Sequence, residues 1–240
     1  MRIFVTAGNT QVPIDRVRCI TNLFTGRTGG LIAMEAQHRG HLVTLLTSHP
    51  EAVPLPSSFE RFTLMAYRTL DDLDTLMDRC IADWKPDAIV HCAAVSDYRS
   101  AGVFAPAPTT HFDPANLTWK DATQSPTMLD RAAGKVKSDE PELWLRLVRA
   151  PKLVDKIRQE WTFRGTLVKF KLEVGITEAE LLVSAERSRQ HSQADWMVAN
   201  TLEGAAHWAF LGNAAGYTKV TRAELAAALL DRLEKEARHG

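Results

Sequence analysis

The connection between the first predicted strand and the first predicted helix constrains this chain more than any other feature. An apolar run at residues 3–5 predicts a strand, and a helical pattern begins at Leu31, which leaves residues 6–30 (TAGNTQVPIDRVRCITNLFTGRTGG) as one connection. Connections longer than about 12 residues are uncommon inside compact domains unless they have a function. We therefore expect this segment to bind something.

The connection is rich in residues that bind anions. Glycine lets backbone N–H groups approach a ligand closely, and the start of the following helix adds the positive end of its dipole. Hydroxyls and cations add further contacts for phosphate. The residues concerned are Gly8, Gly26, Gly29, Gly30, Thr6, Thr10, Thr21, Thr25, Thr28, Arg16, Arg18 and Arg27. We interpret the segment as a phosphate-binding loop, with a purely structural loop as the alternative.

Neither common nucleotide fingerprint is present. The glycine order does not match G-x-G-x-x-G, and Val136 stands where a Walker A motif needs Ser or Thr after Lys135. A nucleotide site in this chain would have to use a less common loop.

Beyond the connection, predicted strands and helices alternate. We expect strands at 42–47, 62–67 and 87–94, and helices at 31–39 and 70–84 with a loop at 49–58. This alternation predicts an α/β fold with a Rossmann-like, doubly wound and mostly parallel sheet, in which ligands bind beyond the carboxyl ends of the strands. The opening loop and residues 93–99 both leave such ends, and we expect them to face one crevice.

The second half is predicted to continue the same sheet after an irregular segment. Residues 100–125 lose all periodicity, so we expect a flap or an interface arm at about 100–138 within a single domain of residues 1–240. Capping-box spacing in TEAE (177–180) and TRAE (221–224) predicts two helix starts, and Pro151 opens another helix. Further strands are expected at 143–148, 166–174, 195–200 and 207–212.

Composition excludes several classes of function. The chain has 29 basic and 29 acidic residues, which argues against a nucleic-acid partner. It has neither an apolar run of about 20 residues, as a membrane span needs, nor the apolar core of a signal peptide. Its three cysteines form neither a metal-ligand spacing nor an even disulfide framework, and its eight histidines are scattered. We therefore expect a cytoplasmic protein with reduced thiols and no metal ligands of its own.

Four polar residues outside the glycines are candidate site residues. Asn22 lies within the opening loop, where an amide can stabilise an oxyanion, although an Asn in a turn is the alternative. Lys135 and Lys137 share a face if the segment is extended, and suit either a polyphosphate or plain solvent exposure. Asp97 follows a strand end and could bind a base or a ribose hydroxyl, or cap a helix.

Taken together, these segments resemble the phosphopantothenoylcysteine synthetase (phosphopantothenate–cysteine ligase) family. Residues 6–30 are similar to its opening signature, and AAVSDYR (93–99) to its second. Further resemblances lie in KVKS (135–138), VRAPKLV (148–154), VKFKLE (168–173) and VANTLE (198–203), in order along the chain. The resemblance implies a Rossmann-like homodimer whose arm reaches toward the partner.

The resemblance also implies a two-step ligation in coenzyme A biosynthesis. The carboxylate of 4′-phosphopantothenate attacks the α-phosphorus of ATP or CTP with Mg²⁺, and the cysteine amine then displaces the nucleotide. It assigns Asn22 and Lys135 to the acyl-nucleotide intermediate, and Arg18 together with Asn22 to substrate binding. The nucleotide would contact Gly8, Thr10, Thr25, Gly26, Ala93, Ala94, Asp97, Lys137 and Asn200. Because the chain begins at the synthetase strand, a stand-alone form without a flavin-dependent decarboxylase is expected.

The chain departs from the family pattern at several positions, which keeps alternatives open. Asn9 replaces a glycine, Phe24 and Thr25 replace a serine pair, and Lys169 and Val174 break the usual strand pattern. A non-catalytic binding descendant of the family is therefore one alternative. A Rossmann-type NAD(P)-dependent oxidoreductase is another, although it predicts a glycine fingerprint and a Tyr-x-x-x-Lys pair that the sequence lacks.

Overall fold

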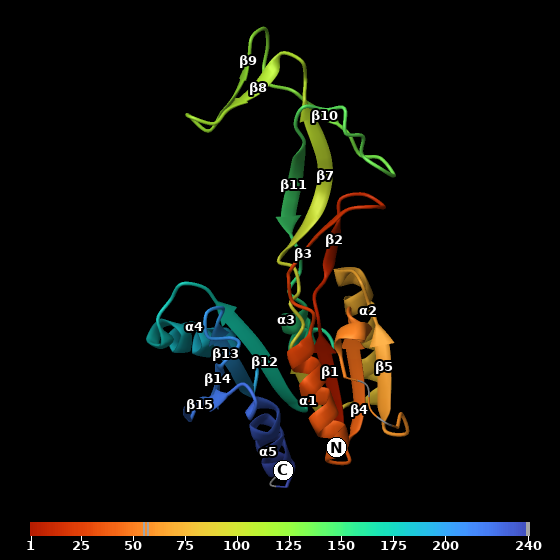
Figure 1. Cartoon of the computed structure of the whole chain (residues 1–240), viewed down its shortest axis with the longest axis vertical. Helices are drawn as coiled ribbons and strands as arrows, with labels where there is room; N and C mark the ends of the chain where they lie inside the picture. The colour runs from red at the N-terminus through yellow and green to blue at the C-terminus, as the bar shows by residue number, and fades with distance from the viewer. Residues whose placement is uncertain (55, 57, 239–240) are drawn as a thin grey trace. The chain divides into compact units, whose positions relative to one another are not determined.

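The computed structural model describes residues 1–54, 56 and 58–238 (Figure 1). The chain divides into two compact units, each described here by itself. The first unit comprises Met1–Thr10, Leu23–Val95 and Lys152–Gly240, and the second comprises Gln11–Asn22 and Ser96–Pro151.

The first unit is built on a mostly parallel sheet, as the sequence predicted. Among the described residues the strand order is β15-β14-β13-β12-β6-β1-β4-β5. The sheet is parallel from β13 to β5, and β14 and β15 add an antiparallel edge. The strands are β1 (Arg2–Ala7), β4 (Leu42–Thr47), β5 (Phe62–Ala66), β6 (Ala88–His91), β12 (Thr166–Glu173), β13 (Trp196–Thr201), β14 (Trp208–Asn213) and β15 (Gly216–Thr221).

Helices cover both faces of this sheet. On one face Ile3 and Val5 pack with Ile32 and Leu229, and on the other Phe4 packs with helical residues of both α2 and α3. This two-sided burial explains why the central strands are continuous apolar runs rather than alternating ones. The helices are α1 (Arg27–His38), α2 (Leu70–Arg79), α3 (Leu153–Gln159), α4 (Glu178–His191), α5 (Leu225–Ala237), the 3₁₀ turn η1 (Pro50–Ala52) and the π-helical turn η2 (Cys80–Trp84), which continues α2.

The two predicted capping boxes differ in outcome. Thr177 and Glu180 form the reciprocal box and start α4 as expected. Thr221 and Glu224 also exchange hydrogen bonds, but α5 begins only at Leu225, so this pair forms the turn that precedes the helix. A third box, formed by Thr69 and Asp72 at the start of α2, was not singled out from the sequence because Asp replaces the usual Glu or Gln.

The opening connection is more ordered than predicted, and α1 begins at Arg27 rather than Leu31. Gly29 and Gly30 therefore lie in the first turn of α1, where a Cβ atom would lie 2.7 Å from Ala7 Cβ and 2.8 Å from Val53 Cγ1 respectively. Close packing against β1 and against the segment after η1, and not loop flexibility, requires these glycines. Part of the predicted 49–58 loop, residues 55 and 57, lies outside the described residues.

The second unit consists of antiparallel strands, although the sequence predicted a strand at 143–148 and an irregular segment at 100–125. Its strands form the sheet β10-β7-β11 and the hairpins β2–β3 and β8–β9. They are β2 (Gln11–Pro13), β3 (Cys19–Thr21), β7 (Tyr98–Pro106), β8 (Thr110–Asp113), β9 (Thr118–Asp121), β10 (Met128–Asp130) and β11 (Trp144–Arg149). The prediction of irregular structure at 100–125 was wrong because β7, β8 and β9 bury few side chains, so their alternation is weak.

Candidate functional site

In the first unit, the candidate nucleotide-binding turn lies where the sheet changes direction. From β1 the chain proceeds to β4 and β5 on one side, and to β6, β12 and β13 on the other. The carboxyl ends of β1 and β6 therefore form the topological switch point, where doubly wound sheets bind ligands.

The backbones of β1 and β6 stay joined beyond the ends of the two strands. Ala94 N donates to Gly8 O at 2.7 Å, and Thr10 N donates to Ala94 O at 3.4 Å. The structure thus brings together Gly8, Thr10, Ala93 and Ala94, which the sequence placed in two separate motifs. Thr10 is fully buried, so its side chain lies beneath this turn.

Two of the predicted glycines are required by the backbone itself. Gly8 and Gly26 have φ values of +88° and +82°, a region that favours glycine. A Cβ atom at Gly8 would also lie 2.2 Å from Ser48 Oγ. Gly26 is the N-cap of α1, and within the described part of the chain this cap makes no side-chain hydrogen bond. The Gly29 N–H interacts with the Cys92 thiol, so the N–H groups before it can serve an anion. Thr25 precedes this cap and is exposed.

Arg222, which lies between β15 and α5 and contacts the start of α1, was missed from the sequence. Its guanidinium donates to Thr28 Oγ1, and burial lowers its pKa. The only sequence signal there was TRAE, which we interpreted as a helix cap, so nothing indicated that Arg222 contacts a segment nearly 200 residues away.

A buried polar row lies beneath the switch-point turn. Thr6, His91 and Lys169 are register partners on β1, β6 and β12, so their side chains share one face of the sheet. Thr6 Oγ1 lies 2.9 Å from His91 Nδ1 and accepts from Ala93 N at 3.3 Å. His91 thereby supports, through Thr6, the backbone of the predicted nucleotide turn.

Burial sets the charge state of this row. It lowers the pKa of His91 to about 4, with the Lys169 charge acting in the same direction. Burial also lowers the pKa of Lys169 to about 8. Lys169 Nζ donates to Ser192 Oγ at 2.6 Å and to Ser188 O at 3.2 Å, which ties β12 to the end of α4. The departure at Lys169 thus has a structural role.

The departure at Asn9 is also accommodated. Asn9 has an ordinary negative φ, and its backbone N–H donates to Ser48 Oγ at 2.8 Å. Its Oδ1 lies 3.2 Å from both Ser48 Oγ and His49 Nε2. Because the side chain is held by the loop after β4, the turn does not need glycine at this position.

Asn200 lies elsewhere on the sheet. It is half-buried near the carboxyl end of β13, opposite Leu172 on β12. Two strands, β6 and β12, separate β13 from β1. Asn200 therefore shares the carboxyl-end edge with Gly8 but does not lie on the same pair of strands.

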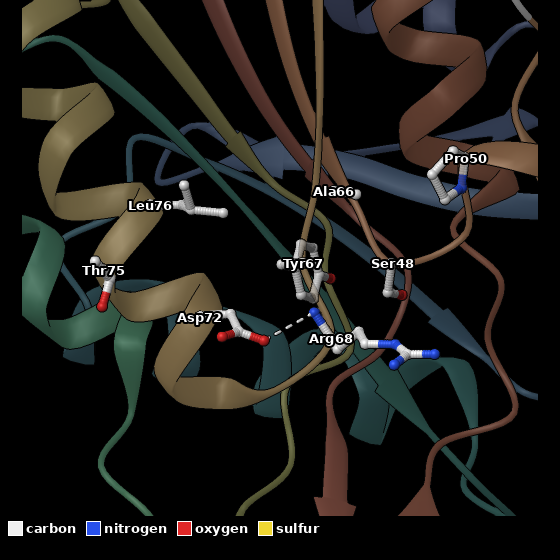
Figure 2. Close-up of a pocket in the computed structure, with 8 residues that line it drawn as sticks. All are labelled: Ser48, Pro50, Ala66, Tyr67, Arg68, Asp72, Thr75 and Leu76. Atoms are coloured by element: carbon white, nitrogen blue, oxygen red, sulfur yellow. Dashed lines mark hydrogen bonds between the residues drawn. The ribbon is translucent and has the colours of Figure 1, made fainter.

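A groove at the carboxyl ends of β4 and β5 was not predicted (Figure 2). It has a volume of about 650 Å³ and is lined by Ser48, Pro50, Ala66, Tyr67, Arg68, Asp72, Thr75 and Leu76. Asp72 accepts from Arg68 N at 3.2 Å, and Tyr67 Oη donates to Ala7 O at 2.7 Å. Burial raises the pKa of Tyr67, so its hydroxyl stays protonated and serves the fold.

The second unit contains Arg18, Asn22, Asp97, Lys135 and Lys137. It brings Arg18 together with both lysines, which line one hollow of about 490 Å³ with Val17, Val136, Ser138 and Asp139. Val136 is buried while Lys135 and Lys137 are exposed, as expected if the two lysines share a face. Three cations against one carboxylate make this lining suitable for an anion.

Asn22 and Asp97 are not among the residues that line this hollow. Asn22 is exposed and directly follows β3, whereas Asp97 is exposed and directly precedes β7. The carbonyl of Asp97 accepts from Ala150 N at 2.9 Å, which joins the two ends of the β7–β11 pair.

The chain is similar to proteins of pantothenate metabolism. Residues 1–107 match the family described as DNA/pantothenate metabolism flavoprotein C-terminal domain. A coenzyme A biosynthesis bifunctional protein CoaBC from Thermococcus kodakarensis is 31% identical over 242 residues, which cover 98% of this chain and 51% of that protein. The chain therefore spans about half the length of this curated relative, and 24% of the Escherichia coli K12 one.

Solved structures agree in fold. The crystal structure of the DNA/pantothenate metabolism flavoprotein from Streptococcus pneumoniae has a TM-score of 0.79 at 26% identity and covers 98% of this chain and 99% of that one. A C-terminal domain of CoaBC has a TM-score of 0.67 at 18% identity, covering 100% and 96%, which shows the fold alone. With the signatures at 6–30 and 93–99, these findings show that the chain belongs to the phosphopantothenoylcysteine synthetase family.

Proposed function

We propose that the protein is a ligase of coenzyme A biosynthesis that joins 4′-phosphopantothenate to cysteine through an acyl-nucleotide intermediate. The observation that carries this proposal is the paired turn of Gly8–Thr10 and Ala93–Ala94 at the switch point, beside the helix start whose N-cap is Gly26. Backbone N–H groups at such a place favour a nucleotide phosphate. The relatives named for coenzyme A biosynthesis support the same assignment.

The chemistry asks mainly for charge neutralisation and positioning. When carboxylate oxygen attacks the α-phosphorus, negative charge develops on the phosphoryl oxygens and pyrophosphate leaves. In this proposal the nucleotide contacts the residues that the family resemblance assigns to it, namely Gly8, Thr10, Thr25, Gly26, Ala93, Ala94, Asp97, Lys137 and Asn200. Lys135 stabilises the developing charge, Asn22 holds the mixed anhydride, and Arg18 contacts the acyl substrate.

The proposal includes Mg²⁺, which would bind together with the nucleotide. No group of three or more His, Cys, Asp or Glu side chains in the described part of the chain is arranged to hold a metal ion. Mg²⁺ that accompanies a nucleotide typically binds its phosphates and keeps several water ligands.

Homodimer formation and a cytoplasmic location are further parts of the proposal. Phe112, Trp119 and Trp144 form an aromatic cluster with ring centroids 4.6–5.3 Å apart in the second unit, where the family resemblance expects the arm. Sedimentation of the purified protein at several concentrations tests the dimer. The described helices are all too short or too polar to cross a membrane.

The decisive experiment measures pyrophosphate release with ATP or with CTP, in the presence of Mg²⁺, 4′-phosphopantothenate and cysteine. Release with either nucleotide that depends on 4′-phosphopantothenate supports the ligase and identifies the preferred nucleotide. Absence of release with both, alongside tight nucleotide binding, would instead support the non-catalytic descendant that the departures at Asn9 and Phe24 suggest. The ordinary φ and satisfied side chain of Asn9 favour the ligase.

Asn22→Asp tests the role proposed for the amide. A second negative centre beside the mixed anhydride should abolish product formation with cysteine while the melting temperature stays unchanged. Asn213→Asp is the matched control, because Asn213 lies in the β14–β15 turn and an aspartate can still accept from Ala215 N. Unchanged turnover in Asn22→Asp would remove this residue from the mechanism.

A further inference from the structure

The carboxylate of Asp15 has an unusual position in the second unit. Its side chain has 0% exposure, although it lies in the connection between β2 and β3. Hydrogen bonds from Arg18 and from backbone N–H groups hold its pKa well below the usual range, so the group is a buried carboxylate ion. Buried charges persist only where partners satisfy them, so the partners of Asp15 define its function.

The two oxygens of Asp15 bind different partners. Oδ1 accepts from Val17 N and Arg18 N, both at 2.8 Å, which shapes the local turn. Oδ2 accepts from Arg18 Nη2 at 2.6 Å and Nε at 3.1 Å, and from Val136 N at 3.0 Å. One oxygen therefore builds the turn, and the other reaches a segment more than 100 residues away.

Arg18 completes this connection at the carbonyl of the same residue, Val136. Its Nη2 also donates to Val136 O at 2.8 Å, so both the N–H and the C=O of Val136 are held by the Asp15–Arg18 pair. Arg16 N adds a hydrogen bond to Gly134 O at 3.1 Å. Because the Val136 side chain is buried, Lys135 and Lys137 are left facing outward on either side of a fixed peptide.

We propose that Asp15 is a positioning residue that acts through Arg18 and the Val136 peptide to hold Lys135 and Lys137 in place. Two lysines on an unsupported segment would repel each other and sample many directions, and the buried carboxylate removes that freedom. The effect of Asp15 on turnover rests on the proposed ligase function. The effect of Asp15 on the conformation of residues 135–137 does not depend on that function.

Asp15→Asn separates the two oxygens. The amide oxygen of asparagine can replace Oδ1 and keep the local turn, but its NH₂ group would then face the donors of Arg18 and Val136. Asp113→Asn is the matched control in the same unit. Asp113 likewise uses Oδ1 for a turn, at Ala115 N and Asn116 N, and Oδ2 for a cation, Lys120, but it lies away from the lysine segment.

The first measurement is limited trypsin cleavage after Lys135 and Lys137, followed by mass spectrometry without any nucleotide. Cleavage at these bonds should be about fivefold faster or more in Asp15→Asn than in the wild type, and unchanged in Asp113→Asn. Equal cleavage rates in Asp15→Asn and the wild type would overturn the proposal. If Asp15→Asn fails to fold by its thermal melt, Arg18→Gln, which loses the hydrogen bond to Val136 O and the ion pair with Asp15, must show the faster cleavage.

The second measurement is a double-mutant cycle on pyrophosphate release. Asp15→Asn alone should lower kcat by about 10-fold or more. If Asp15 acts through Lys135, adding Asp15→Asn to Lys135→Gln should change kcat less than twofold further, whereas a general structural effect would multiply the two losses. Multiplied losses would overturn the positioning role. If the wild type itself releases no pyrophosphate, the ligase proposal fails, and trypsin cleavage alone decides the role of Asp15.

Discussion

The backbone of Gly26 lies directly against that of Gly8, so a Cβ atom at Gly26 would lie 2.2 Å from Gly8 N. Gly26→Ala should therefore destabilise the protein twice, through a strained positive φ and through a clash with main chain that cannot move aside. We expect the free energy of unfolding to fall by about 2 kcal/mol or more. Urea denaturation measures it.

Gly175→Ala is the control for the strain alone. Gly175 has a φ of +68° but no atom within 4 Å of the position of its Cβ. Its substitution should cost about 1 kcal/mol. Similar losses in the two variants would mean that Gly26 and Gly8 are not in close contact.

Lys135→Gln tests charge stabilisation by the lysine segment. Removing one fixed cation from a developing phosphoryl charge should lower kcat for pyrophosphate release by about 100-fold or more. The KM for nucleotide should change much less, because Lys137 and the proposed backbone contacts of the first unit remain. Lys85→Gln, at an exposed position in the first unit, should behave as wild type. A loss confined to KM would assign Lys135 to ground-state binding instead.

His91 should make the protein sensitive to acid. Its folded-state pKa of about 4 lies below the ordinary value of 6.5, so between these values the unfolded chain binds a proton that the folded chain does not. The contribution of neutral His91 to the free energy of unfolding is therefore complete above pH 6.5. It is lost as the pH drops toward 4, by a total of about 3 kcal/mol. Urea unfolding across pH 4–7 should show a shallower fall in His91→Gln, whereas the exposed His38→Gln should retain the wild-type fall.

The cysteines should differ in reactivity. Cys19 is exposed on β3, whereas burial raises the pKa of Cys92 to about 12 and also raises that of Cys80. A thiol reagent at pH 8 should therefore label one cysteine fast and the other two slowly in the folded protein. Cys19→Ser should remove the fast phase, and its persistence would show that Cys80 or Cys92 is accessible.

Much of the first unit could be predicted because its strands are buried on both faces. The run at 42–47 matches β4 in full, and the box at Thr177 starts α4. In such segments the local sequence alone, either a continuous apolar run or a capping motif, indicates the element. The start of α1 could not be placed, because Gly29 and Gly30 usually break helices and are needed here only for contacts with Ala7 and Val53.

The motif residues of the candidate site could be predicted from the sequence, but the residues that hold them in place could not. The motif residues Gly8 and Ala94 came together as expected, since parallel strand ends share an edge. His91, Arg222 and Asp15 each contact a residue distant in sequence, and no local pattern indicates such a pair. In the second unit the predicted strand at 143–148 corresponds to β11, whereas β7 through β9 were missed because, with few buried side chains, they have little alternation to detect.

The pairing that continues past the ends of β1 and β6 has a thermodynamic consequence. Ala94 N and Thr10 N make hydrogen bonds that join the turn after β1 to the turn after β6. The backbone of both turns is therefore already ordered when the chain folds. A ligand arriving there would therefore lose little affinity to backbone entropy. Heat-capacity changes on nucleotide binding should accordingly be small in the first unit, and any large ordering signal would have to arise elsewhere in the chain.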